Sequence, residues 1–186
     1  DVVRLFDGTT QVGTATLSAQ NITDGYVEIE SATRTPGSLG FSATVSDAAG
    51  NVSQASESLA VVLDTTEPVI SRADVNGNTV VLTYTEAGVG VAGTTPAAGD
   101  FTVTKGAGNT VLTVNAVVVD AVNKTVTLTL SAPLSSSDSN VKVSYTPGVN
   151  RVQDIAGNEA DALTGQEVVN HTPAITSFFV DGATTT

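Results

Sequence analysis

The sequence contains no cysteine, methionine or tryptophan, and only 4% of its 186 residues are aromatic. Without cysteine there is no disulfide framework, so stability must come from core burial, neighbouring domains or a bound metal. The single histidine, His171, stands in a linker with no serine and carboxylate set around it. No glycine-rich phosphate loop joins a strand to a helix. The sequence therefore predicts that the chain is not an enzyme.

Positive charge is also scarce, because 7 basic residues face 19 acidic ones and the formal net charge is −12. A polyanion would be repelled by this charge, so nucleic acid is not an expected partner. An anionic membrane surface is disfavoured for the same reason, and no apolar window approaches the ~18 residues of a membrane helix. Cations and neighbouring repeats are the expected partners, and the chain is expected to be a monomer.

The remaining composition is dominated by Thr, Val, Ala, Ser and Gly, which favours β structure with many turns. Apolar and polar residues alternate with period two along 80–84, 125–130 and 141–145, as in half-buried antiparallel strands. No segment shows a helical period. We therefore predict an all-β fold of Ig-like antiparallel β-sandwiches of the Greek-key type. The strands predicted in the complete sandwich are 69–75, 78–86, 101–105, 111–120, 125–131, 141–146 and 161–169.

An internal sequence repeat divides the chain into modules. Residues 68–77 and 173–182 share proline, isoleucine, valine and glycine in register, about 105 residues apart, which is the size of a whole domain. A linker at 64–68 ends in a proline that stops the preceding strand. The tandem modules predict an extended rod. The predicted parts are 1–66, a sandwich of about six strands that lacks its first; 67–171, a complete sandwich; and 172–186, the first strand of a following module.

Acidic residues gather at one end of the second module. Since antiparallel strands alternate in direction, the strand that ends at Glu86 and the loop 154–159 lie at the same end as the linker. Carboxylates held this close repel one another. Calcium, which takes about 6–8 oxygen ligands, would relieve that repulsion, whereas zinc lacks cysteine and histidine ligands and magnesium keeps more water. The predicted calcium ligands are Asp64, Glu67, Glu86, Asp154 and Asn158.

The loop Asp154-Ile155-Ala156-Gly157-Asn158 also has a simpler interpretation as a plain turn, because Asx side chains bond their own backbone. The same Asp-x-x-Gly-Asn motif recurs at 47–51 in the first module. Asp47 and Asn51 are therefore predicted to form half of another calcium site, facing a preceding domain. The second linker, 170–173, carries no carboxylate, so calcium is less expected there and His171 is expected to be a solvent-exposed linker residue.

The segments RLFDGTTQVGTATL, FSATVSDAAGNVS and LAVVLDTTEP resemble the bacterial Ig-like (BIg-type) repeats of giant secreted adhesins. The segments VNGNTVVLTYTEA, AAGDFTVT, KTVTLTLSAPL, VKVSYTPG and VQDIAGNEA resemble the SwmB-type Ig-like repeat of the same RTX-like class. The resemblance implies type I secretion, a bacterial cell-surface location and a role in adhesion or biofilm formation. It also implies calcium at domain junctions, with ligands at Asp64, Glu67, Asp154 and Asn158.

Three functions follow as hypotheses. The first is a structural extender whose calcium-stiffened sandwiches hold a distal binding domain away from the cell. The second is a ligand-binding module for carbohydrate or ice, which should expose an aromatic platform or a flat threonine face. The third is an accessory Ig-like domain of a secreted hydrolase. The sequence favours the extender, because it offers neither binding surface clearly.

Overall fold

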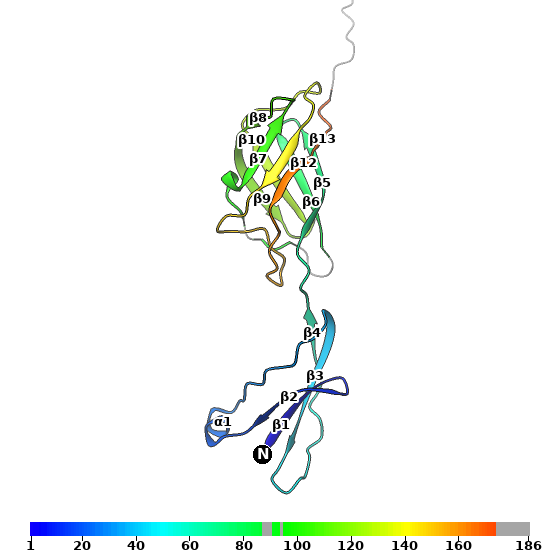
Figure 1. Cartoon of the computed structure of the whole chain (residues 1–186), viewed down its shortest axis with the longest axis vertical. Helices are drawn as coiled ribbons and strands as arrows, with labels where there is room; N and C mark the ends of the chain where they lie inside the picture. The colour runs from blue at the N-terminus through cyan, green and yellow to red at the C-terminus, as the bar shows by residue number, and fades with distance from the viewer. Residues whose placement is uncertain (87–90, 94, 174–186) are drawn as a thin grey trace, which may run out of the picture. The chain divides into compact units, whose positions relative to one another are not determined.

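The computed structural model describes residues 1–86, 91–93 and 95–173 and separates into two units, Asp1–Thr65 and Thr66–Thr186 (Figure 1). Nearly all of the regular structure is β, in several antiparallel sheets, which confirms the predicted all-β fold. No helix in the described part of the chain has the length and apolarity that a membrane crossing requires. The predicted third part, 172–186, lies almost wholly outside the described residues and stays a prediction.

Unit 2 is a two-layer sandwich. A five-stranded sheet has the order β13-β5-β6-β10-β9, and a four-stranded sheet has the order β12-β11-β7-β8. The chain changes sheet between β6 and β7, β8 and β9, β10 and β11, and β12 and β13. It therefore alternates between the two layers that enclose one core. The strands are β5 (Val69–Asn76), β6 (Thr79–Thr85), β7 (Phe101–Lys105), β8 (Thr110–Leu112), β9 (Val114–Asp120), β10 (Thr125–Leu130), β11 (Lys142–Tyr145), β12 (Leu163–Glu167) and β13 (Val169–Asn170), with a 3-10 turn η1 (Ala98–Asp100) before β7.

The core of unit 2 follows the alternation seen in the sequence. Strands β6 and β10 turn every second side chain inward, and β11 does the same from the opposite sheet. Within the four-stranded sheet, Phe101 on β7 is paired with Tyr145 on β11, and their rings stack with centroids 4.9 Å apart. The inward faces of the two sheets together form one hydrophobic core. The alternating residues that are buried here are Val80, Leu82, Tyr84, Val126, Leu128, Leu130, Val141, Val143 and Tyr145.

Two of the predicted strands are each divided in the structure. The segment 111–120 passes from β8 to β9 at Thr113, where the chain leaves one sheet and joins the other. The segment 161–169 ends as β12 and resumes as β13, which pairs parallel with β5 through Val169 and Asn170. A continuous β-rich run cannot reveal such a change of sheet, because both halves keep strand periodicity.

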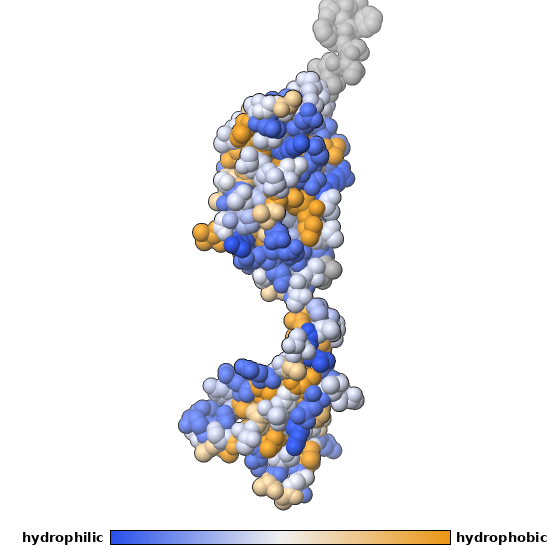
Figure 2. All heavy atoms as spheres, viewed as in Figure 1, coloured by the Kyte–Doolittle hydropathy of each residue, from blue (hydrophilic) through white to orange (hydrophobic). Residues whose placement is uncertain are grey.

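Unit 1 contains one four-stranded antiparallel sheet with the order β2-β1-β3-β4. This order matches β8-β7-β11-β12 of unit 2: a hairpin, a third strand beside the first member of that hairpin, and a last strand at the edge. Apolar side chains of both units reach the surface at several places (Figure 2). The strands are β1 (Val2–Asp7), β2 (Thr10–Thr16), β3 (Gly37–Ser46) and β4 (Leu59–Leu63).

The prediction of about six strands in the first module is wrong, since the described residues of unit 1 form four. Residues 51–58 follow β3 without forming a regular ladder. The backbone N–H groups of Val45 and Ala43 donate to the hydroxyls of Ser53 and Ser56, both at 3.0 Å, where a strand would offer carbonyl oxygens. Serine hydroxyls compete with the backbone for such bonds, so this segment is an irregular return.

One short helix, α1 (Ala19–Asp24), was not expected from the sequence. The hydroxyl of Ser18 caps its N-terminus by accepting from the backbone N–H of Asn21, and the Asn21 side chain accepts in return from the Ser18 N–H. Gly25, at φ 78°, ends it in the left-handed conformation that glycine adopts readily. Six residues are too few to display a helical period, so only these capping residues signal the helix.

Prediction for the core. Replacing the fully buried Val126 on β10 with alanine should lower the free energy of unfolding of unit 2 by about 2–3 kcal/mol, because two methyl groups leave a packed interior. The matched change at Val118 on the adjacent β9, which is 59% exposed, should stay within about 0.5 kcal/mol. Urea unfolding followed by the near-ultraviolet signal of the buried tyrosines measures both. Equal losses in the two variants would contradict the assigned inward face.

Candidate metal centre

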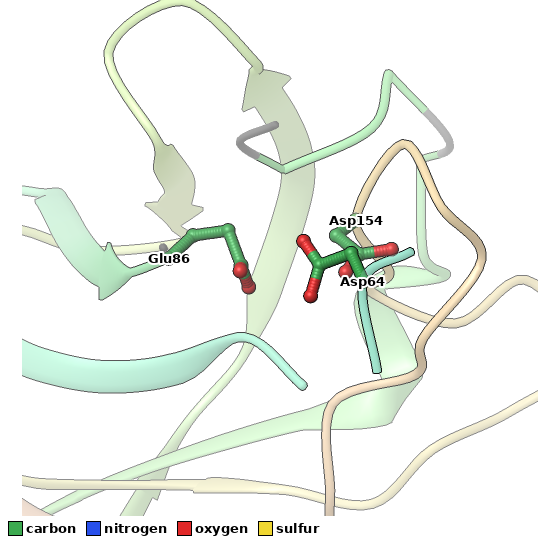
Figure 3. Close-up of side chains that lie close together, drawn as sticks. All are labelled: Asp64, Glu86 and Asp154. Carbon is green, nitrogen blue, oxygen red and sulfur yellow. The ribbon is translucent and has the colours of Figure 1, made fainter. Parts of the chain in front are cut away.

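Three carboxyl groups lie close together near residues 64–68, the connecting segment that joins β4 to β5. One carboxylate oxygen from each of Asp64, Glu86 and Asp154 lies within 4.8 Å of the others. Glu86 is 6% exposed, Asp154 is fully buried and Asp64 is half-buried. Figure 3 shows the carboxyl groups of Glu86 and Asp64 facing each other, with Asp154 next to Asp64. All three residues are among the calcium ligands predicted from the sequence.

Glu86 owes its position to the end of β6. The strand continues to Thr85, so the next residue leaves the sheet at the end where the acids gather. The turn before β10 supports it, because the Nζ of Lys124 donates to the main-chain oxygen of Glu86 at 2.7 Å. The main-chain oxygen of Lys124 in turn accepts from the N–H of Tyr84 at 2.9 Å. The backbone of Glu86 is thus tied to the neighbouring turn.

Asp154 is held by its own loop. Its Oδ1 accepts from the backbone N–H of Asn158 at 2.8 Å, and its Oδ2 accepts from the Asn158 side-chain amide at 2.7 Å. Gly157 closes the turn at φ 93°, donating its N–H to the Asp154 carbonyl. An isolated bridge to Val91 ties the same loop to the segment after Glu86. The carboxylate is therefore oriented before any ligand arrives.

The loop 47–51 of unit 1 repeats this geometry. Oδ1 of Asp47 accepts from the Asn51 N–H at 2.8 Å and Oδ2 from the Asn51 amide at 2.7 Å, while Gly50 has φ 92°. Each loop stands between the third strand of its sheet order and the edge strand, β3 and β4 here and β11 and β12 in unit 2. The motif is thus a self-contained turn in both units. The two turns differ in burial, because Asp47 is exposed and Asp154 is buried.

The spacing of the three oxygens bears on which ion the cluster could hold. Calcium–oxygen distances of about 2.3–2.6 Å allow two ligands of one ion to lie roughly 4.6–5.2 Å apart at most. Magnesium–oxygen distances of about 2.0–2.1 Å reduce that limit to roughly 4.2 Å. Three equally spaced oxygens must lie closer than this pairwise limit, at most roughly 4.0–4.5 Å apart around calcium and roughly 3.6 Å apart around magnesium. Oxygens that lie within 4.8 Å of one another therefore need a smaller adjustment to share calcium than to share magnesium.

The other predicted ligands lie elsewhere in the structure. Glu67 is not one of the three converging acids and lines a cavity on the same unit. Asn158 contacts the cluster by orienting Asp154, and its part as a direct ligand stays a prediction. Asp47 and Asn51 bond to each other, and among the described residues no group of three acids includes Asp47. A second calcium site there also stays a prediction.

An ion-pair group at the second linker was not predicted from the sequence. His171 is half-exposed, but its Nε2 lies 2.8 Å from Oδ1 of Asp74, and the Nε of Arg72 lies 2.5 Å from Oδ2. The N–H of His171 donates to the Val75 carbonyl at 2.8 Å, so the linker follows β13 along β5. The alternation of Arg72 and Asp74 on one face of β5 was the available signal.

Comparison with known families finds a repeat family whose model matches most of unit 2. Residues 63–150 match the family model SWM_repeat, described as "Putative flagellar system-associated repeat". The match covers Asp64, Glu86 and most of the sandwich, and it is consistent with the resemblance to SwmB-type repeats. A search of curated proteins found no match for the chain.

Prediction for the paired loops. Hydrogen bonds from the side chain and then the backbone of Asn51 hold the pKa of Asp47 below its usual value of 3.8. Asn51→Ala should therefore raise the titration midpoint of Asp47, measured by carboxyl ¹³C NMR. Because the folded pKa is lowered, the stabilisation from Asp47 is complete above pH 3.8 and is lost as the pH falls through the folded value.

The turn at Asp120 provides the reciprocal control. The backbone and then the side chain of Asn123 lower the pKa of Asp120 in the same way. Asn123→Ala should raise the midpoint of Asp120 and leave that of Asp47 unchanged. If Asn51→Ala did not move Asp47, the closed-loop geometry would be wrong in solution.

Proposed function

We propose that this chain is a pair of structural repeats from a bacterial cell-surface adhesin, without a catalytic role, in which calcium fastens the connecting segment to unit 2. The observation that carries the proposal is the convergence of carboxylate oxygens from Asp64, Glu86 and Asp154 within 4.8 Å. Asp64 belongs to the last residues of unit 1, between β4 and β5, and the other two lie on unit 2. An ion bound by all three would restrict the movement of the connecting segment.

The chemistry of the donors favours a hard cation. All three side chains offer oxygen, and main-chain carbonyls and water can complete the shell of about 6–8 ligands. Bringing buried carboxylates together has a Coulombic cost that a dication offsets. Two of the three are buried here, so the ion would act where screening by salt is weakest.

The expected calcium affinity is suited to stiffening a linker. Extracellular calcium modules bind with a Kd of roughly 10⁻⁴–10⁻³ M. At ten to a hundred times that concentration, the bound state gains about 1.4–2.7 kcal/mol. This is small beside the roughly 5–15 kcal/mol stability of a domain. For a short linker it is enough to favour one geometry about ten- to a hundredfold, so calcium would chiefly set stiffness and reach.

The surface of the chain supports the extender over the alternative of a carbohydrate- or ice-binding module. Tyr84 and Tyr145 are buried, and among the described residues Tyr26 is the one exposed tyrosine. A single ring is a small stacking platform for a sugar. The family description associates the matched repeat with the flagellar system, and an extracellular location, reached by type I secretion, would supply the calcium. An accessory domain of a secreted hydrolase is the remaining alternative.

Prediction for calcium binding. Adding calcium to the chelated full chain should raise the melting temperature of unit 2 by roughly 4–10 °C, the shift that about 1.4–2.7 kcal/mol gives a domain of this size. Asp64→Asn, Glu86→Gln and Asp154→Asn should each reduce or abolish the shift. Calorimetry of binding gives an independent Kd. The matched control is Asp47→Asn, which alters the twin loop of unit 1.

If wild type and all variants melted alike with and without calcium, the metal proposal would fail. If Asp47→Asn reduced the shift as much as Asp154→Asn, the ion would lie elsewhere. A normal shift in Asp64→Asn alone would leave a site within unit 2 that does not involve the connecting segment.

Prediction for stiffness. Small-angle scattering of the full chain should report a narrower distribution of maximum dimension in calcium than in chelator, because the ion restricts the connecting segment. Glu86→Gln should scatter alike in both conditions. An unchanged radius of gyration in wild type, under conditions where calorimetry reports saturation, would refute the stiffening role while preserving calcium binding.

A further inference from the structure

A cavity of 150 Å³ opens between the two sheets of unit 2, away from the β5–β13 pair. Strand β13 pairs with β5 only at Asp74 and Val75, so residues 69–73 form an edge of the five-stranded sheet among the described residues. Strand β12 is the edge of the opposite sheet. The cavity lies between these two edges, where neither sheet has a further strand to close the gap.

Two pairs of residues face each other inside the cavity. Ile70 and Tyr84 are partners on β5 and β6, and Leu163 and Tyr145 are partners on β12 and β11. The interior is therefore mainly aromatic and aliphatic. The hydroxyl of Tyr145 accepts from the N–H of Val152 at 2.9 Å, which fixes that ring.

The hydroxyl of Tyr84 differs from that of Tyr145. Tyr84 is 3% exposed, yet no described residue hydrogen-bonds to its Oη. Burial raises the pKa of this hydroxyl well above its usual value, so it remains neutral. A buried hydroxyl without a hydrogen-bond partner destabilises the folded state. A ligand that reached it with a hydrogen-bonding group would relieve part of that destabilisation.

Two carboxylates line the same cavity. Glu67 and Asp161 are both exposed, and no hydrogen bond or ion pair joins either to another described residue. They supply the negative charge around an otherwise apolar opening, on a chain whose net charge is −12. An occupant complementary to this arrangement is apolar along its length and positively charged at one end.

We propose that this cavity binds the side chain of a lysine from a partner polypeptide. Its methylene stem would pack between Ile70 and Leu163, as lysine stems do on apolar surfaces. Its ammonium has three donors, which match the carboxylates of Glu67 and Asp161 and the Tyr84 hydroxyl. A cavity of about 150 Å³ accepts benzene in another protein, so a lysine side chain fits within the volume. The inference does not depend on the proposed calcium function.

The test is an NMR titration of the full chain in chelator with the tripeptide acetyl-Ala-Lys-Ala-amide. Shifts should be saturable and centred on the Ile70 and Leu163 methyl groups and the Tyr84 ring. The matched peptide with norleucine in place of lysine should bind at least about fivefold more weakly. Glu67→Gln and Asp161→Asn should each weaken lysine binding about two- to fivefold, the range for a partly exposed charge pair, and Tyr84→Phe should weaken it too.

The control variant is Glu167→Gln, which removes the same charge from an exposed ion pair with Lys142 on the same unit and should leave the affinity unchanged. Equal binding of the norleucine peptide would overturn the proposal, as would equal weakening by Glu67→Gln and Glu167→Gln, which would indicate diffuse attraction. Displacement of the peptide by calcium in both wild type and Asp154→Asn would also overturn it, because the two carboxylates would then belong to an ion site.

Discussion

The candidate metal centre depends on the mutual repulsion of three carboxylates, those of Asp64, Glu86 and Asp154, which lie within 4.8 Å of one another. Asp154 is fixed by two hydrogen bonds from Asn158, and Glu86 is fixed at the end of a core strand, so neither can turn away without local rearrangement. Asp64 directly follows β4 and belongs to unit 1, so the cluster combines one carboxylate from the end of that unit with two from unit 2.

The Asp-x-x-Gly-Asn loop has the same geometry in both units, whereas the cluster of three acids among the described residues includes only the loop of unit 2. The closed turn of Asp-x-x-Gly-Asn forms from its own five residues and has nearly the same hydrogen-bond lengths at 47–51 and 154–158. The turn thus orients a carboxylate, and surrounding acids decide whether that carboxylate can share an ion. The plain-turn interpretation and the metal interpretation of the motif are therefore compatible, because the turn orients the carboxylate that an ion would use.

Much of the sandwich could be predicted because its signals are local. Alternation along β6, β10 and β11 identifies the inward residues, and strand direction brings Glu86 and Asp154 to the linker end. Features that depend on pairing partners were not predictable in this way. The change of sheet at Thr113, the parallel pairing of β13 and the irregular return at 51–58 all arise from which strand lies alongside. Helix α1 was missed because it is shorter than the window in which a period can be recognised.

The serine-bonded return beside β3 has a consequence for how this sheet meets other chains. Strand β4 covers residues 37–41 of β3, and the hydroxyls of Ser53 and Ser56 occupy the N–H groups of Val45 and Ala43 beyond that point. An open strand edge is a template on which another polypeptide can add. The two hydroxyl groups occupy donors that such a strand would need, so this part of β3 cannot pair with it through these N–H groups.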